Sequence, residues 1–227
     1  MEKREELILD HLGRYTISLK KVIDELYFDG GSAQNTLNKL VTSDLIQSIQ
    51  NGLSGNFRYY QLTIKGAKTR SVPPNRAREK EPKGLSQDIA ALWFSCMGDV
   101  RRKRLSTTEL RSLFGAPKGG NVIHIAEDAG EESTVYRLFV PSDHSSLRSF
   151  VATLKKSAHD AFGDERLLRW IERGTYTLLV LLQNESRRED LRRLIKDEEF
   201  PDIRIRLDLG PSAATLREFI SPEKEFS

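Results

Sequence analysis

The chain has 227 residues, of which 38% are hydrophobic and 30% are charged, so it is long enough for two compact domains with separate cores. Its formal net charge is +3, and residues 1–83 hold the excess, with 14 Lys and Arg against 10 Asp and Glu. A single cysteine, Cys96, excludes an internal disulfide, and no Cys/His cluster has the spacing of a zinc finger. The N-terminus is charged and no apolar run is long enough to span a membrane. We therefore expect a cytoplasmic protein without a membrane segment, metal or cofactor.

Residues 1–68 show three amphipathic helix patterns followed by two strand patterns, and we expect them to form one domain. Apolar residues recur at helical spacing in 4–13, in the segment after Ser18 and in the segment after Ser32, and each serine stands where it would cap a helix. Residues 45–50 alternate between apolar and polar, residues 57–62 do so less regularly, and the stretch between them is rich in glycine and asparagine. This order predicts a β-hairpin after the third helix.

The third predicted helix carries polar residues that suit base recognition. Leu37, Leu40 and Val41 are expected to face inward, which leaves the amides and the lysine of this segment facing solvent. Asn and Gln pair bidentately with adenine, whereas Lys reaches guanine or phosphate. Basic residues in the second strand and after it suit contacts with the phosphate backbone. The predicted DNA-binding residues are Ser32, Gln34, Asn35, Asn38, Lys39, Arg58, Lys65, Lys68 and Arg70.

This order of elements resembles the winged-helix superfamily, in which a helix for the major groove precedes a two-stranded wing. The resemblance rests on residues 37–40, 44–46 and 60–66, and it covers roughly the first 70 residues. It implies an α+β fold that binds double-stranded DNA, and a homodimer, since one such helix covers only a few base pairs. Winged helices also serve as protein-binding modules, so a protein-interaction adaptor remains the alternative.

Two basic stretches follow the first domain. Residues 69–84 contain three prolines, mixed charges and few apolar residues, which predicts a flexible basic linker that either attracts phosphate or acts as a plain tether. Beyond it, a compact cationic run is expected to form an exposed turn with secondary phosphate contacts. The run consists of Arg101, Arg102, Lys103 and Arg104.

Residues 85–227 have the pattern of an α/β domain with a mixed sheet. The predicted elements are a helix at 86–94, a helix that begins at 106–109, a hairpin of strands at 121–125 and 134–140, helices at 145–161 and 167–171, an apolar strand at 175–182, a helix at 185–196 and an alternating strand at 202–209. The apolar run is typical of a strand buried on both faces, and the alternating strand of a sheet edge. We expect this domain to bind a protein partner or to self-associate, through the helix at 85–94 and the strand at 202–209.

In its order of domains and its length, the chain also resembles plasmid and mobile-element replication-relaxation and relaxosome proteins. In these, a winged helix precedes a domain with the restriction-endonuclease-like (PD-(D/E)XK) fold. Nucleases of that fold need a carboxylate near one strand and Glu-x-Lys on the next, to hold a divalent ion and position water. Here the strand at 135–140 has no carboxylate, and the Glu-x-Lys at 81–83 lies in the predicted linker. We therefore expect a degenerate, non-catalytic domain.

The alternative from another class is a metal-dependent nuclease or relaxase, which would bind its metal through the acidic residues Asp128, Glu131 and Glu132 at the predicted hairpin tip. The four histidines are scattered, and although Asp143, His144 and Ser145 are the residue types of a catalytic triad, neighbours in sequence seldom form its geometry. The sequence thus predicts no catalytic residue. It favours a sequence-specific DNA-binding protein that acts as a transcriptional regulator or as an accessory factor of a plasmid or mobile element.

Overall fold

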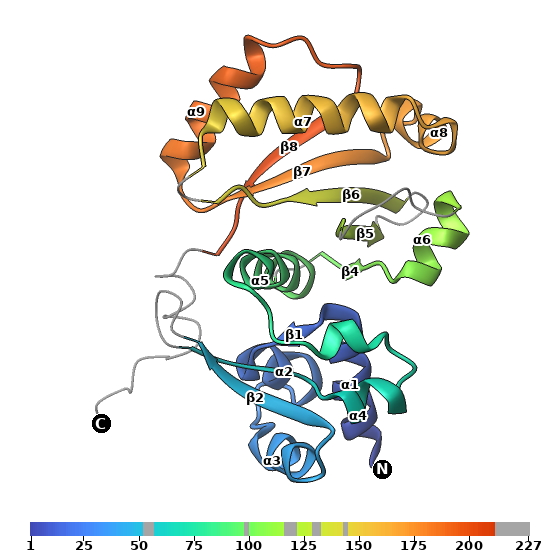
Figure 1. Ribbon diagram of the computed structural model, residues 1–227, viewed down its shortest axis with the longest axis vertical. Helices are drawn as coiled ribbons and strands as arrows, with labels where there is room; N and C mark the ends of the chain where they lie inside the picture. The colour runs from blue at the N-terminus through green and yellow to red at the C-terminus, as the bar shows by residue number, and fades with distance from the viewer. Residues whose placement is uncertain (52–56, 98–99, 116–121, 129–132, 143–144, 212–227) are drawn as a thin grey trace. The chain divides into compact units, whose positions relative to one another are not determined.

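A computed structural model describes residues 1–51, 57–97, 100–115, 122–128, 133–142 and 145–211. The chain divides into two compact units, one containing Met1–Leu92 and the other Trp93–Gly210. Each unit has its own hydrophobic core and its own β-sheet, so the protein is α+β with two separate sheets (Figure 1).

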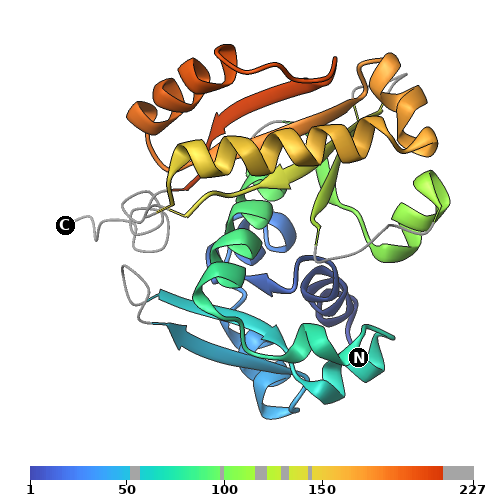
Figure 2. The same cartoon turned by 45° about the horizontal axis from the view of Figure 1, so that its top comes forward.

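The first unit has the three helices and the hairpin strands that the sequence predicts. Its elements are α1 (Lys3–Tyr15), β1 (Ile17–Ser18), α2 (Lys20–Tyr27), α3 (Gln34–Thr42), β2 (Ile46–Asn51), β3 (Phe57–Leu62), α4 (Ile64–Thr69) and the 3-10 helix η1 (Pro74–Ala77). Strand β3 lies between β1 and β2 and is antiparallel to both (Figure 2). The predicted hairpin tip at 52–56 lies outside the described residues.

Ser18 does not cap α2 as predicted, because it belongs to β1 and its side chain is used elsewhere. His11 of α1 lies 2.9 Å from the Ser18 hydroxyl through Nε2, and the Tyr27 hydroxyl lies 3.0 Å from its Nδ1. The Ser18 hydroxyl donates to the Leu19 carbonyl oxygen, so the tautomer with the proton on Nε2 satisfies all three side chains. This buried network joins α1, β1 and α2.

The segment predicted to be a flexible linker is instead packed on the first unit. Ala77 of η1 is part of the core, and its carbonyl oxygen accepts a hydrogen bond of 2.8 Å from the buried amide of Gln61. Arg76 donates to the carbonyl oxygens of Gly13 and Arg14 at the end of α1. Proline at the start of η1 fits a first helical turn, where no backbone N–H is needed. Hydrogen bonds from side chains to main-chain carbonyl oxygens therefore hold a segment that has too few apolar residues to form a core of its own.

Helix α5 (Pro82–Cys96) starts within that predicted linker, and its last residues belong to the second unit. The other elements of this unit are β4 (Arg102–Arg104), α6 (Thr107–Phe114), β5 (His124–Asp128), β6 (Ser133–Phe139), α7 (Leu147–Phe162), α8 (Glu165–Glu172), β7 (Tyr176–Leu182), α9 (Glu185–Lys196) and β8 (Arg204–Leu209). The strands follow one another in the order β4-β5-β6-β7-β8. The first three are antiparallel and the last three parallel, which makes the sheet mixed, as predicted.

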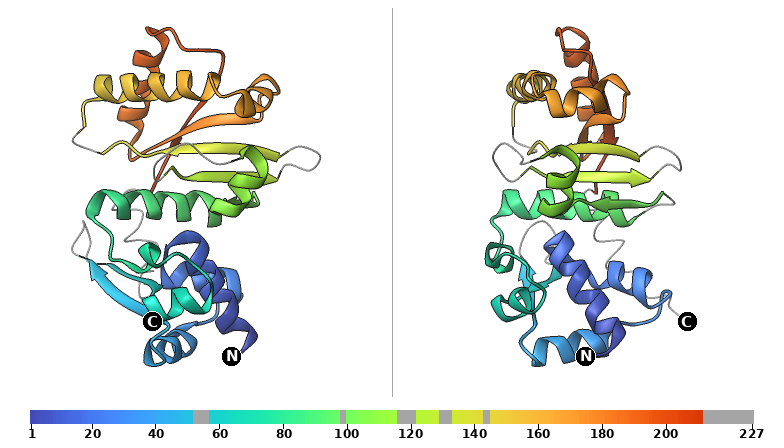
Figure 3. Two further views of the ribbon diagram at one scale, coloured as in Figure 1. Left: turned by 45° about the vertical axis from the view of Figure 1, so that its right-hand side comes forward. Right: turned by 90° about the vertical axis from the view of Figure 1, so that its right-hand side faces the viewer.

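Helices α7, α8 and α9 cover one face of this sheet, and Figure 3 shows the same layer from two further sides. The core there combines side chains of α7 and α9 with alternate residues of β7, such as Leu178 and Val180. All seven residues of β7 are buried, as the apolar run predicts. On the opposite face, Phe94 of α5 packs edge-on against Tyr136 of β6, with 5.5 Å between ring centroids.

A glycine in α4 fixes how this helix packs against the chain before β2. A Cβ atom at Gly66 would lie 1.9 Å from the carbonyl oxygen of Leu45, whereas a Cβ at Gly84 in α5 would meet nothing within 4 Å. We expect Gly66→Ala to lower the free energy of unfolding of the first unit by about 3 kcal/mol or more, because backbone must move. Gly84→Ala should be neutral or stabilise by up to about 1 kcal/mol. Hydrogen exchange of α1 amides measures both, and equal protection in the two variants would contradict the expectation.

Burial lowers the pKa of His11 to about 3, against an ordinary value of 6.5. Between these two pKa values the unfolded chain binds a proton at His11 that the folded unit does not. The folded first unit therefore has its full stability above pH 6.5 and loses free energy of unfolding as the pH falls toward 3. The expected slope is about 1.4 kcal/mol per pH unit.

In His11→Gln this slope should disappear from the pH dependence of α1 hydrogen exchange, because glutamine does not titrate. His159→Gln, at an exposed position on α7, is the matched control and should keep the slope. A slope that persists in His11→Gln would assign it to other groups.

Candidate nucleic-acid interface

Helix α3 presents an exposed polar face above a buried apolar one. Leu37 and Leu40 belong to the core, while Asn35, Asn38 and Lys39 are exposed. Val41 was predicted to face inward, but 38% of its surface is exposed. It lies next to the last residue of α3, where the core no longer covers the helix. The periodicity of the sequence thus places the polar face correctly except at the end of the helix.

The start of α3 is held by Asp24 of α2. One carboxylate oxygen of Asp24 accepts a hydrogen bond of 2.7 Å from the backbone N–H of Ala33, and the other binds Lys20 at 2.6 Å. Ala33 is the N-cap residue, so Ser32 stands one position before the cap and accepts only a 3.3 Å hydrogen bond from the N–H of Gln34. Asp24 is a positioning residue that the sequence analysis did not identify.

The amides of α3 are linked along the helix surface. The Gln34 side chain donates a hydrogen bond of 2.8 Å to the side-chain oxygen of Asn38, one turn further on. This pairing leaves the Asn38 amide nitrogen and the Gln34 side-chain oxygen available, and Asn35 lies exposed beside them. Together these groups offer donors and acceptors in the pattern that suits an adenine edge.

Lys39 is paired with acidic residues of α1. Its ammonium lies 2.6 Å from Glu5 and 3.0 Å from Glu2. Hydrogen bonding to Glu5, and then to Glu2, raises the pKa of Lys39, and the same contact lowers the pKa of Glu5. The lysine predicted to contact bases therefore has its charge balanced within the protein, and a contact with DNA requires these ion pairs to rearrange.

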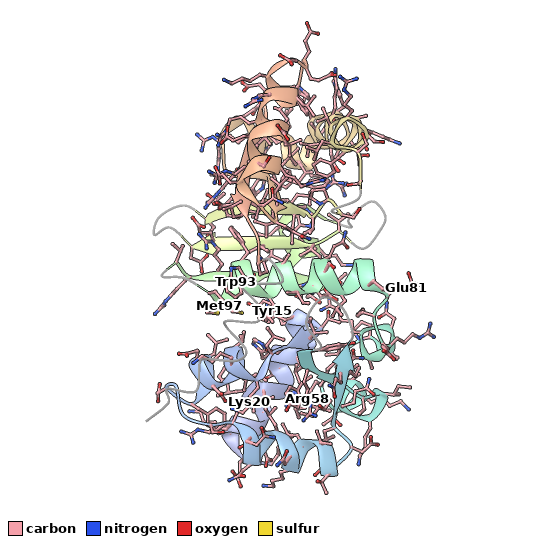
Figure 4. All side chains as sticks on the ribbon, turned by 90° about the vertical axis from the view of Figure 1, so that its left-hand side faces the viewer. Tyr15, Lys20, Arg58, Glu81, Trp93 and Met97 are labelled. Carbon is pink, nitrogen blue, oxygen red and sulfur yellow. The ribbon has the colours of Figure 1, made fainter. Side chains whose placement is uncertain are left out.

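The remaining predicted phosphate-binding residues of the first unit differ in their exposure and in whether they bind other residues of the protein. Arg58 on β3 and Lys68 on α4 are exposed (Figure 4 labels Arg58). Lys65 donates a hydrogen bond of 2.8 Å to the carbonyl oxygen of Ser43, just after α3. Arg70 pairs with Asp10 of α1 through a 2.7 Å hydrogen bond. Arg58 and Lys68 are thus the cations that meet solvent most directly, whereas Lys65 and Arg70 have structural partners.

The cationic run at 101–104 is not an exposed turn. Arg102 lies in the edge strand β4, where its side chain pairs with Glu127 of β5 at 2.6 Å and stacks 4.2 Å over the Phe94 ring. Arg104 is buried, and Lys103 is 3.5 Å from Glu109. Of the four cations, Arg101 and Lys103 are exposed. An arginine-rich segment forms a strand here, and one of its charges, Arg102, pairs with a carboxylate on the neighbouring strand.

The acidic residues of the nuclease alternative do not form a metal site in the described structure. Asp128 ends β5 and accepts a hydrogen bond of 3.1 Å from Ser133, and Glu131 and Glu132 lie outside the described residues. Across the described ranges, no group of three His, Cys, Asp or Glu side chains is arranged to hold a metal ion.

A buried polar cluster lies between β5, β6 and β7 on the helix-covered face. His124 Nε2 lies 3.3 Å from the Tyr176 hydroxyl, and Arg137 is the residue opposite His124 in the sheet. Burial, with Arg137 nearby, lowers the pKa of His124 to about 4, and burial raises that of Tyr176 to about 12. Both side chains are therefore neutral near pH 7, and its lowered pKa makes His124 a weaker base than an ordinary histidine.

No protein family, curated protein or solved structure matches this chain. The described part of the chain contains no helix long and apolar enough to cross a membrane.

The pairing of Arg102 predicts a structural role for this residue. Arg102→Ala would leave Glu127 largely buried without its cation, so we expect the free energy of unfolding of the second unit to fall by roughly 3 kcal/mol. Arg101→Ala, at the exposed neighbouring position, should change it by less than about 0.5 kcal/mol. Trp93 and Trp170, the two tryptophans of the chain, both belong to this unit, so their fluorescence during urea unfolding reports it selectively. Equal effects of the two variants would refute the structural role.

Proposed function

We propose that the first unit is a winged-helix domain that binds double-stranded DNA in a sequence-specific manner. The observation that carries this proposal is the order α1-β1-α2-α3-β2-β3 with β3 between β1 and β2. In this arrangement α3 is followed directly by an antiparallel hairpin, which is how a winged helix places a major-groove helix beside its wing. The exposed amides on α3 support the proposal, because they are the side chains that pair with adenine.

The contacts that this proposal favours are fewer than the sequence predicts. Asn35, Asn38 and Gln34 are assigned to base edges, and Arg58 and Lys68 to phosphates. Gln34 is half-buried and the other four are exposed, all on or near α3 and the hairpin. Lys39 contributes only after it leaves its two glutamates.

For the second unit we propose a degenerate nuclease-like domain that does not cleave DNA. The order α5, β4, α6, β5, β6, α7, α8, β7, with an antiparallel part and a parallel part of the sheet, supports a restriction-endonuclease-like fold. On β6, where such nucleases carry metal-binding carboxylates, this chain has Val135, Tyr136 and Arg137. The whole protein would then act as a transcriptional regulator or as an accessory factor of a plasmid or mobile element.

The first test is selection of bound fragments from random DNA by the full chain, followed by titration of the recovered sequence. Asn35→Ala with Asn38→Ala should weaken binding to the selected sequence at least tenfold, since each bidentate amide contact discriminates by about 1–3 kcal/mol. Binding to unrelated DNA should change little. Asn75→Ala, an exposed asparagine on η1, is the matched control and should bind as the wild type does.

A salt series separates base contacts from phosphate contacts. Arg58→Ala and Lys68→Ala should each weaken binding to every sequence and reduce the slope of log K against log salt by about 1. A separate cleavage assay tests the second unit. The full chain is incubated with supercoiled plasmid and Mg²⁺, and cleavage that stops when the metal is chelated would reject the non-catalytic assignment. If no sequence survives the selection, the protein-interaction alternative replaces DNA binding.

A further inference from the structure

Strand β8 is the last strand of the five-stranded sheet, and none of the described strands pairs with its outer edge (Figures 1 and 2). Apolar and charged residues alternate along it. Ile205 and Leu207 pack against the helix-covered core, whereas Arg204, Arg206 and Asp208 belong to the opposite face. Leu209 is 43% exposed although it continues the apolar series. The strand is therefore only half covered by its own unit.

The outer edge also carries backbone groups that have no hydrogen-bond partner among the described residues. Gly210 directs its N–H to Leu182 of β7, and successive residues of a strand point their N–H and C=O groups to opposite sides. Ile205, Leu207 and Leu209 therefore direct theirs away from β7. Pro201 and Pro211 bracket the strand, so backbone pairing is limited to the residues between them. Such an edge is a template for another strand.

We propose that β8 pairs antiparallel with β8 of a second copy of this chain, around a two-fold axis through Leu207 and perpendicular to the sheet. The five-stranded sheets of the two copies would then form one continuous sheet. The proposal does not depend on DNA binding, because it involves only the second unit.

The charges of β8 select this register. Directly opposed residues of an antiparallel pair share a face, so a two-fold axis must pass through one residue position. An axis at Arg204, Arg206 or Asp208 sets that charge against its own copy, and an axis at Ile205 sets Arg204 against Arg206. Of the positions in β8, only an axis at Leu207 sets Arg206 against Asp208, and it opposes no like charges. Arg206 of each copy then lies opposite Asp208 of the other, which gives two attractive pairs.

The same register matches the apolar residues. Leu207 meets its own copy, and Ile205 meets Leu209, which covers the exposed leucine. The three residues whose backbone groups face the open edge form the hydrogen-bonded pairs, so the Arg206 and Asp208 side chains fall at the closely spaced positions between them. In the single chain these two side chains bind each other, with Arg206 Nη2 2.7 Å from Asp208, and both remain accessible, at 40% and 34% exposure. The intrachain pair can therefore be exchanged for pairs between copies.

The test uses the full chain without DNA and measures homodimers and heterodimers by native mass spectrometry. Wild type should dimerise. R206D and D208R should each raise the dissociation constant roughly tenfold or more, because both replace two attractive pairs with two repulsive ones. Mixing R206D with D208R should restore dimers that contain one chain of each, since every opposed pair then has opposite charges. The double variant R206D/D208R should form homodimers again.

The mixing step distinguishes the interface from a role within one chain. The intrachain pair of Arg206 and Asp208 is broken in both single variants and stays broken on mixing, so only pairing between copies predicts the rescue. R204D is the matched control, because in this register Arg204 faces Gly210 of the second copy, and it should dimerise as the wild type does. Tryptophan fluorescence confirms that each variant is folded. A monomeric wild type, a loss of dimers in R204D, or a mixture without heterodimers would each overturn the proposal.

Discussion

The turn between α2 and α3 depends on a single buried carboxylate, and the surface proposed for DNA depends on that turn. Asp24 binds the first N–H of the α3 region with one oxygen and Lys20 with the other, while its own carbonyl oxygen accepts hydrogen bonds from Phe28 and Gly30. Asp29 and Gly30 adopt positive φ angles within this turn. Because a carboxylate hydrogen-bonded at a helix N-terminus fixes the entry of the chain, Asp24 determines where α3 begins.

Much of the fold could be predicted because its determinants are local. Leu37 and Leu40 are one turn apart and both buried, so the period of apolar residues located the faces of α3. The unbroken apolar run of β7 likewise indicated a strand buried on both sides, and Ser106 with Glu109 formed the capping box that their spacing predicts at the start of α6.

What the sequence did not predict depends on contacts between distant residues. Lys39 is neutralised by Glu5, which lies 34 positions earlier, and no spacing rule connects the two. The segment at 69–84 has few apolar residues, yet Arg76 and Ala77 attach it through hydrogen bonds to backbone carbonyl groups, which composition does not reveal. Arg102 appeared to be an exposed cation because its partner Glu127 joins it only when the sheet forms. In each case a long-range hydrogen bond or ion pair overrides a local pattern.

The two proposals complement each other in their energetics. With Lys39 held by its glutamates, α3 offers few free contacts, and Asn35 and Asn38 provide discrimination of only a few kcal/mol. A monomer would therefore distinguish its site poorly from the many competing sites of a genome. A second copy joined through β8 would add a second α3 to the same assembly. Once the first α3 has bound DNA, the second would bind at a high effective concentration. The charge pattern of β8 and the sparse contacts of α3 thus support the same proposal, in which two chains bind DNA together.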